Sequence, residues 1–148
     1  MKEHQNLFRD LQEDFRKMKK NLLVAQSGGP TAAINATLAG VIKQAIKEEQ
    51  IDQVYGACYG IQGVLEQKFV NLTEKVDTEE KLEKLKRTPA AALGSCRFKL
   101  NDIKEDDSQY QEIVDILHKM NIGYFVYIGG NDSMDTVAKL SAYCKEKG

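Results

Sequence analysis

The sequence has 148 residues, enough for one domain with a single buried core. Its 21 basic and 22 acidic residues leave a net charge of −1, so the composition gives no reason to expect nucleic acid or an anionic membrane as a partner. No apolar run approaches the ~20 residues that span a bilayer, and the N-terminus lacks the apolar core of a secretory signal. The three cysteines form no Cys-x-x-Cys pair, so we expect a soluble cytoplasmic protein without disulfides or structural zinc.

Residues 1–20 are rich in charges and carry apolar residues at helical spacing. These apolar residues are Leu7, Phe8, Leu11, Phe15 and Met18. The segment is either a docking helix or an N-terminal extension that packs on its own domain or frays, and the second interpretation is preferred.

From residue 21 onward, short apolar segments alternate with helical patterns. Strands are expected over residues 22–25, 54–58 and 124–128, the last as a buried parallel strand, with a further short strand within 64–72 and a small apolar segment at 90–93. Helices are expected over residues 31–49, 78–87 and 108–120, and from Met134 onward, where Met134, Val137 and Ala138 share one face. This alternation predicts one α/β domain over 21–148, a doubly wound, Rossmann-like and mostly parallel sheet with helices on both faces.

Four expected strand-end loops combine glycine with polar residues: 26–30, 59–63, 94–97 and 129–133. In doubly wound sheets the ligand lies beyond the carboxyl ends of the strands, so we expect these loops to meet there. The pair Gly28 and Gly29 permits close backbone approach to a phosphate, but an ordinary tight turn explains it equally well. The Gly-Lys-Ser/Thr ending of a Walker loop is absent. Arg97 is either a phosphate clamp or an ordinary surface arginine.

The last of these loops has the most informative pattern. Gly129 and Gly130 follow the final expected strand, and Asn131, Asp132 and Ser133 are all residues that begin helices well. A strand, a glycine pair and a helix N-terminus together bring backbone N–H groups and a positive dipole end toward a phosphate. The simpler interpretation is a helix cap with an acid in its first turn.

Taken together, the four loops resemble the phosphofructokinase family. The resemblance rests on residues 25–36 (AQSGGPTAAINA), 59–63 (YGIQG), 93–97 (LGSCR) and 129–133 (GGNDS), which agree with the family in order and spacing. It covers residues 21–148 and implies transfer of a phosphoryl group to the 1-hydroxyl of fructose 6-phosphate, with Mg²⁺. It also implies a homo-oligomer for the full-length enzyme.

The resemblance also implies roles for individual residues. Backbone around the position matching Gly29 touches donor phosphates, and the arginine matching Arg97 holds donor phosphate and stabilises the transferring group. Aspartate at the position of Asp132 marks the branch that uses pyrophosphate, whereas glycine there leaves room for the α-phosphate of ATP. The donor-binding residues expected on this basis are Gly28, Gly29, Gly130, Asp132 and Ser133.

The sequence departs from the family pattern in two ways. Asn131 stands where the family has a magnesium-binding aspartate; its carbonyl oxygen can still bind a hard cation, with one negative charge fewer. The family's Thr-Ile-Asp-Asn-Asp segment, whose first aspartate is the catalytic base, has no match in the 148 residues. We therefore expect a truncated, incomplete fold that supplies the donor side and is inactive alone. The alternatives are an ATP-dependent 6-phosphofructokinase and a non-catalytic phosphate-binding or regulatory half-module.

Overall fold

The computed structural model describes the whole chain except residues 1, 28–31, 97, 103 and 148. In chain order, its elements are α1 (Lys2–Met18), β1 (Lys20–Gln26), α2 (Ala32–Lys47), β2 (Ile51–Ala57), α3 (Gly60–Leu65), β3 (Phe69–Asn71), α4 (Leu72–Lys75), α5 (Glu79–Arg87), α6 (Ser108–Lys119), β4 (Ile122–Ile128) and α7 (Asn131–Lys147).

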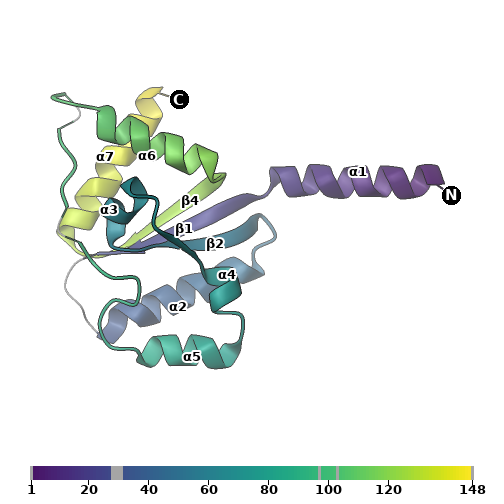
Figure 1. Cartoon of the computed structure of the whole chain (residues 1–148), viewed down its shortest axis with the longest axis horizontal. Helices are drawn as coiled ribbons and strands as arrows, with labels where there is room; N and C mark the ends of the chain where they lie inside the picture. Colours follow the sequence, from purple (N-terminus) through teal and green to yellow (C-terminus); the bar gives the residue numbers. More distant parts are fainter. Residues whose placement is uncertain (1, 28–31, 97, 103, 148) are drawn as a thin grey trace.

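The sheet of the described residues has the strand order β3-β2-β1-β4, in which β1 pairs in parallel with both β2 and β4 (Figure 1). The short strand β3 is antiparallel to β2. Side chains alternate across β1 because successive residues of a strand point to opposite faces. Leu22 and Val24 enter one buried cluster, whereas Leu23 and Ala25 enter the other.

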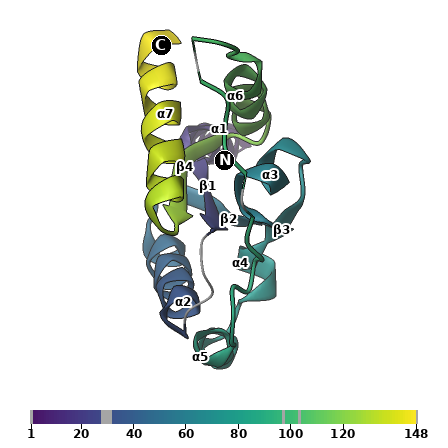
Figure 2. The same ribbon diagram turned by 90° about the vertical axis from the view of Figure 1, so that its left-hand side faces the viewer.

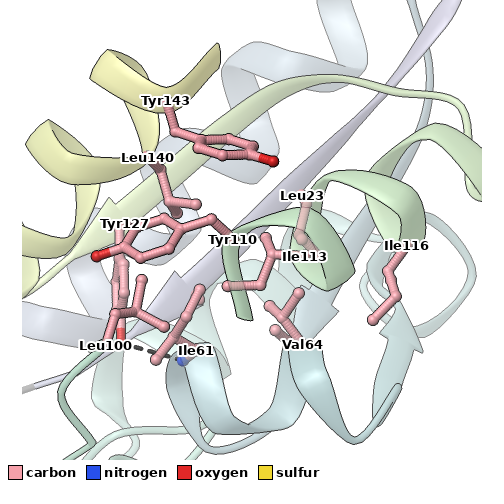
Figure 3. Packing of buried hydrophobic residues seen from close by; sticks show 12 residues of the cluster. Leu23, Ile61, Val64, Leu100, Tyr110, Ile113, Ile116, Tyr127, Leu140 and Tyr143 are labelled. Atoms are coloured by element: carbon pink, nitrogen blue, oxygen red, sulfur yellow. Dashed lines mark hydrogen bonds between the residues drawn. The ribbon is translucent and has the colours of Figure 1, made fainter. Parts of the chain in front are cut away.

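Each face of the sheet is covered by helices, as the two orthogonal views show (Figures 1 and 2). Helices α2, α4 and α5 pack on one face, around Leu38, Ile42 and Leu82. Helices α3, α6 and α7 pack on the other, where Ile61, Ile113, Leu140 and the rings of Tyr110 and Tyr143 form the core (Figure 3). The predicted doubly wound α/β fold is therefore confirmed.

Three local predictions were wrong. The expected loop 59–63 is mostly helix α3, whereas the expected short strand within 64–72 is confirmed as β3. Residues 90–93 form no strand, so the loop 94–97 does not follow one. Strand β4 is parallel as expected, but only Tyr127 is buried, because β4 lies at the end of the strand order and is half-covered.

The buried stripe of α7 also differs from the prediction. Met134 is 50% exposed, and the helix instead buries Ser133, Thr136, Leu140 and Tyr143. Small polar side chains can occupy a buried stripe when they are hydrogen-bonded, and the Thr136 hydroxyl donates to a backbone carbonyl one turn earlier. A pattern built from apolar residues alone therefore selects the wrong face.

Helix α1 extends away from the rest of the molecule (Figure 1). Leu7, Phe8 and Leu11 are each more than half exposed. This part of the helix therefore does not pack on its own domain, which was one of the arrangements expected from the sequence. The side chains of Phe15 and Met18 lie outside the described part of the chain.

Candidate functional site

The carboxyl ends of β1 and β4 form the switch point of the sheet. These two strands are neighbours and parallel, but α2, which follows β1, and α7, which follows β4, cover opposite faces. Between such strands the two connections diverge, which leaves a crevice at the carboxyl edge of the sheet, the usual position of a ligand in open α/β folds.

Ser27 joins the chain segments at this edge. Its backbone N–H donates to the Ile128 carbonyl at 2.8 Å, so the end of β1 is fixed beside the end of β4. Its hydroxyl donates to the Cys96 carbonyl at 3.1 Å, which brings the described end of the 94–97 loop to the same place.

The segment after β2 is attached to this edge by two further hydrogen bonds. The Tyr59 N–H donates to the Leu93 carbonyl at 2.8 Å, and the Ile61 N–H donates to the Tyr127 hydroxyl at 3.1 Å. Burial raises the pKa of Tyr127, so its phenol stays neutral and can accept this bond at neutral pH. The described parts of the four predicted loops therefore do converge.

The two glycines after β4 have different surroundings. A Cβ on Gly129 would overlap the Ser133 hydroxyl and lie 2.7 Å from the Ser27 carbonyl, so packing requires glycine there. Among the described residues, no atom lies within 4 Å of a Cβ built on Gly130. No described residue fills the space beside Gly130, whereas Ser133, which is 3% exposed, packs beneath the turn instead of facing solvent.

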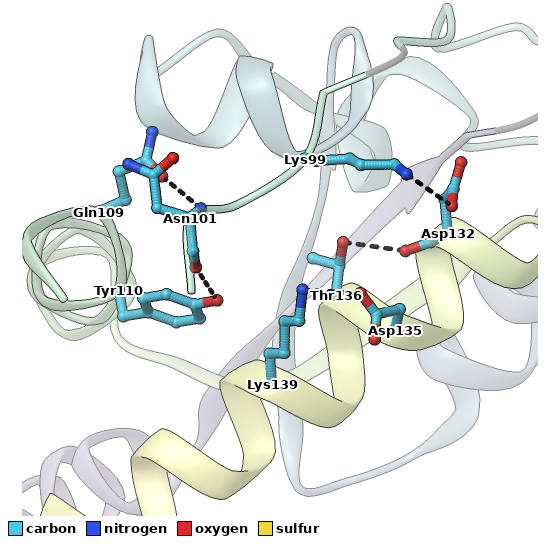
Figure 4. Close-up of polar contacts among 8 residues, drawn as sticks. All are labelled: Lys99, Asn101, Gln109, Tyr110, Asp132, Asp135, Thr136 and Lys139. Carbon is cyan, nitrogen blue, oxygen red and sulfur yellow. Dashed lines mark hydrogen bonds and ion pairs between the residues drawn. The ribbon is translucent and has the colours of Figure 1, made fainter. Parts of the chain in front are cut away.

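The first turn of α7 presents exposed oxygen atoms. Asn131 is exposed, and the Asp132 side chain is 80% exposed with its carboxylate 3.9 Å from the Lys99 ammonium (Figure 4). The Asp132 carbonyl accepts a hydrogen bond from the Thr136 hydroxyl, as expected within a continuous helix. The first N–H groups of a helix have no partners within it, so this turn combines N–H donors with a carboxylate. The proximity of Lys99 was not expected from the sequence.

Three predicted site residues, Gly28, Gly29 and Arg97, lie outside the described residues. Among the residues that are described, no three histidine, cysteine, aspartate or glutamate side chains form a cluster able to hold a metal ion.

Sequence reasoning missed two site-adjacent residues, Gln26 and Asn35, which are fully buried at the end of β1 and in the first turns of α2. Their side-chain amides bond to each other at 3.1 Å, and both bond to the segment that leads to Cys96. The available signal was an asparagine within an otherwise apolar helical stripe, between Ile34 and Leu38.

The fold and this edge define an open α/β protein with a candidate ligand site at its switch point, and the comparisons give its family. Residues 21–146 match the model of the family described as Phosphofructokinase, so the chain belongs to the phosphofructokinase family.

The similar proteins are more specific. The sequence is 44% identical over 123 residues to a pyrophosphate–fructose 6-phosphate 1-phosphotransferase of Rhodospirillum rubrum, covering 83% of this chain and 29% of that enzyme. It is 32% identical over 122 residues to ATP-dependent 6-phosphofructokinase 3 of Bacteroides thetaiotaomicron, covering 80% of this chain and 34% of that enzyme.

The fold also matches a solved structure. The crystal structure of a pyrophosphate-dependent phosphofructokinase from Nitrosospira multiformis superposes with a TM-score of 0.78 at 37% identity, over 87% of this chain and 31% of that chain. The chain thus spans less than a third of the length of these pyrophosphate-dependent relatives. No helix of the described residues is long and apolar enough to cross a membrane.

Proposed function

We propose that this chain supplies the donor side of a pyrophosphate-dependent phosphofructokinase, which transfers phosphate from pyrophosphate to the 1-hydroxyl of fructose 6-phosphate. The observation that carries the proposal is the exposed Asp132 carboxylate, placed in the first turn of α7 beside the open space at Gly130. The greater identity to the pyrophosphate-dependent relative than to the ATP-dependent one supports the choice of donor.

A carboxylate at this position selects the donor by charge and by size. A third phosphate and its nucleoside would extend the donor beyond pyrophosphate, toward Asp132. Two unit charges about 4 Å apart repel by about 1 kcal/mol in bulk water and about 4 kcal/mol at an effective dielectric near 20. Because Asp132 is exposed, the lower value applies until a ligand displaces water, and it corresponds to roughly fivefold discrimination; the upper value corresponds to roughly a thousandfold.

The exposed oxygens of Asn131 and Asp132 are of the type that Mg²⁺ binds, although they are too few to form a complete site. We propose that they assist a magnesium ion held mainly by the donor phosphates, whose charge the ion neutralises when bound. Lys99 and the N-terminus of α7 then contribute positive potential from the protein.

We assign these residues no role in binding the acceptor, fructose 6-phosphate, or in activating its hydroxyl. Nothing in the 148 residues matches the family segment that carries the catalytic base, so the chain alone should bind the donor without transferring phosphate. We propose that the complete enzyme is a homo-oligomer in the cytoplasm. That compartment keeps thiols reduced, which agrees with the free cysteines of this chain.

Isothermal titration of the chain with pyrophosphate and with ATP, each with Mg²⁺, tests the choice of donor. We expect pyrophosphate to bind about tenfold tighter or more. Asp132→Asn removes the charge and should raise ATP affinity about fivefold, and Asp132→Gly should raise it further. The matched control is Asp135→Asn on the same helix, where the aspartate pairs with Lys139 and should not affect either donor. Tighter binding of ATP to the unmodified chain would instead support an ATP-dependent enzyme.

A further inference from the structure

The segment between α5 and α6 has no strand or helix to fix its first part, residues 88–96. Backbone N–H and C=O groups that lack such partners must bond elsewhere if they are buried. Several of these groups bond to side chains of other elements, and four of the bonds are made by two fully buried amides, Gln26 and Asn35.

Asn35 holds three backbone groups of this segment. Its Nδ2 donates to the Thr88 carbonyl at 2.6 Å and to the Ala90 carbonyl at 2.5 Å, and its Oδ1 accepts from the Ala92 N–H at 2.9 Å. Because carbonyls only accept and N–H groups only donate, these partners fix the orientation of the amide.

Gln26 completes the arrangement. Its Oε1 accepts from the Leu93 N–H at 2.8 Å, and its Nε2 donates to the Asn35 Oδ1 and to the Ile34 carbonyl. Among the described residues, no buried side-chain nitrogen or oxygen lacks a hydrogen-bond partner. The network therefore connects the end of β1, the start of α2 and the segment 88–93 without an unsatisfied member.

The backbone held by these bonds is partly strained. Ala90 has a φ of 61°, in the left-handed region, which is unfavourable for a residue with a Cβ. Such a conformation persists where the surroundings determine it, and here Asn35 binds the Ala90 carbonyl itself. Gly94, at φ 77°, then turns the chain toward Cys96 and the switch point.

Stability alone does not require two buried amides, because replacing a polar pair by apolar groups of similar shape can be nearly neutral. We propose that Gln26 and Asn35 are positioning residues, whose side-chain amides fix residues 88–93, the segment that leads to Cys96, against the carboxyl edge of the sheet and so shape the donor site from its edge. The inference rests on the proposed function for the identity of the ligand, pyrophosphate, but not for the placement of the segment.

The test compares Asn35→Leu with Leu38→Ala, a control one turn further along α2 that also removes buried contacts but packs on the sheet. Amide hydrogen exchange by NMR is measured well below the unfolding transition, together with Mg²⁺–pyrophosphate affinity by titration. In Asn35→Leu we expect about tenfold faster exchange at Ala92 and Leu93 than in the control, unchanged exchange at Ser27, and about tenfold weaker pyrophosphate binding. In Leu38→Ala we expect unchanged affinity of the folded protein.

Unchanged local exchange in Asn35→Leu, or equal loss of affinity in the control, would overturn the inference. Gln26→Leu, which removes a single bond to the segment, replaces Asn35→Leu if that variant does not fold, with faster exchange expected at Leu93. If the unmodified chain does not bind pyrophosphate, the proposed function fails, and the exchange measurements still decide whether the amides position the segment.

Discussion

Asn35 and Asn131 have the same side-chain amide and lie at the same edge of the sheet, but their surroundings are opposite. Asn35 is fully buried and makes four hydrogen-bond contacts with its neighbours, whereas Asn131 is exposed at the start of α7. The Asn35 amide is hydrogen-bonded within the protein, whereas the Asn131 amide is accessible to a ligand or to water. The edge of the sheet thus divides into a buried clamp around Gln26 and Asn35 and an exposed corner around Asp132.

The largest expected difference between the clamp and the corner is in stability. Asn35→Ala leaves the Thr88 and Ala90 carbonyls and the Ala92 N–H without their partner, at about 1–3 kcal/mol for each group that water does not reach. We expect a total loss of about 3–5 kcal/mol in urea unfolding. The matched change Asn131→Ala should stay within about 0.5 kcal/mol. Equal losses in the two variants would contradict the division.

The adjacent glycines give the next largest contrast. Gly129→Ala should cost about 1–3 kcal/mol, because its Cβ would overlap the Ser133 hydroxyl. Gly130→Ala should leave thermal stability almost unchanged, since its Cβ enters open space, but it should weaken pyrophosphate binding in a titration. If Gly130→Ala bound pyrophosphate normally, the open space would not be the donor site.

Tyr127, whose hydroxyl attaches α3 to β4 at this edge, should give the protein an alkaline limit. Burial raises its pKa, so its contribution to stability is complete below the unfolded-chain pKa of about 10 and is lost as pH rises through the higher folded value. Tyr127→Phe should cost about 1–2 kcal/mol at neutral pH, because the Ile61 N–H loses its partner. Urea unfolding at increasing pH should show a smaller alkaline loss in the variant. Some loss should remain, since burial also raises the pKa of Tyr110.

The smallest effect on stability is expected at Lys99. Its ion pair with Asp132 is solvent-exposed, so Lys99→Met should change the free energy of unfolding by less than about 0.5 kcal/mol. Pyrophosphate affinity should fall about threefold or more, and the difference should shrink as salt is added. Lys139→Met, which breaks the Asp135 pair, is the control and should not change affinity. Unchanged binding in Lys99→Met would exclude Lys99 from the donor region.

Much of the fold could be predicted from local patterns, because helix and strand periods are local properties of the sequence. The strands at 22–25 and 54–58 and the helices at 31–49 and 108–120 lie within or close to β1, β2, α2 and α6. Predictions failed where burial depends on distant segments. Met134 looked like a core residue of α7, but the neighbours of that helix place Ser133 and Thr136 inside.

The candidate site was predictable only in part. Glycines and helix-starting residues marked the corner at 129–133, because their conformational preferences are visible in a single segment. The role of Asn35 was not visible there, since its partners at 88, 90 and 92 are more than 50 residues away.

The sequence by itself determined the alternation of strands and helices, the glycine corner and the presence of a carboxylate at Asp132. The tertiary structure alone decided that β1 and β4 are neighbours, that Gly129 is packed while Gly130 is open, and that Lys99 lies near Asp132. The physical reason is that conformational preference and hydrophobic period act over a few residues. Strand order and burial, in contrast, arise when segments far apart in the chain compete for the same core.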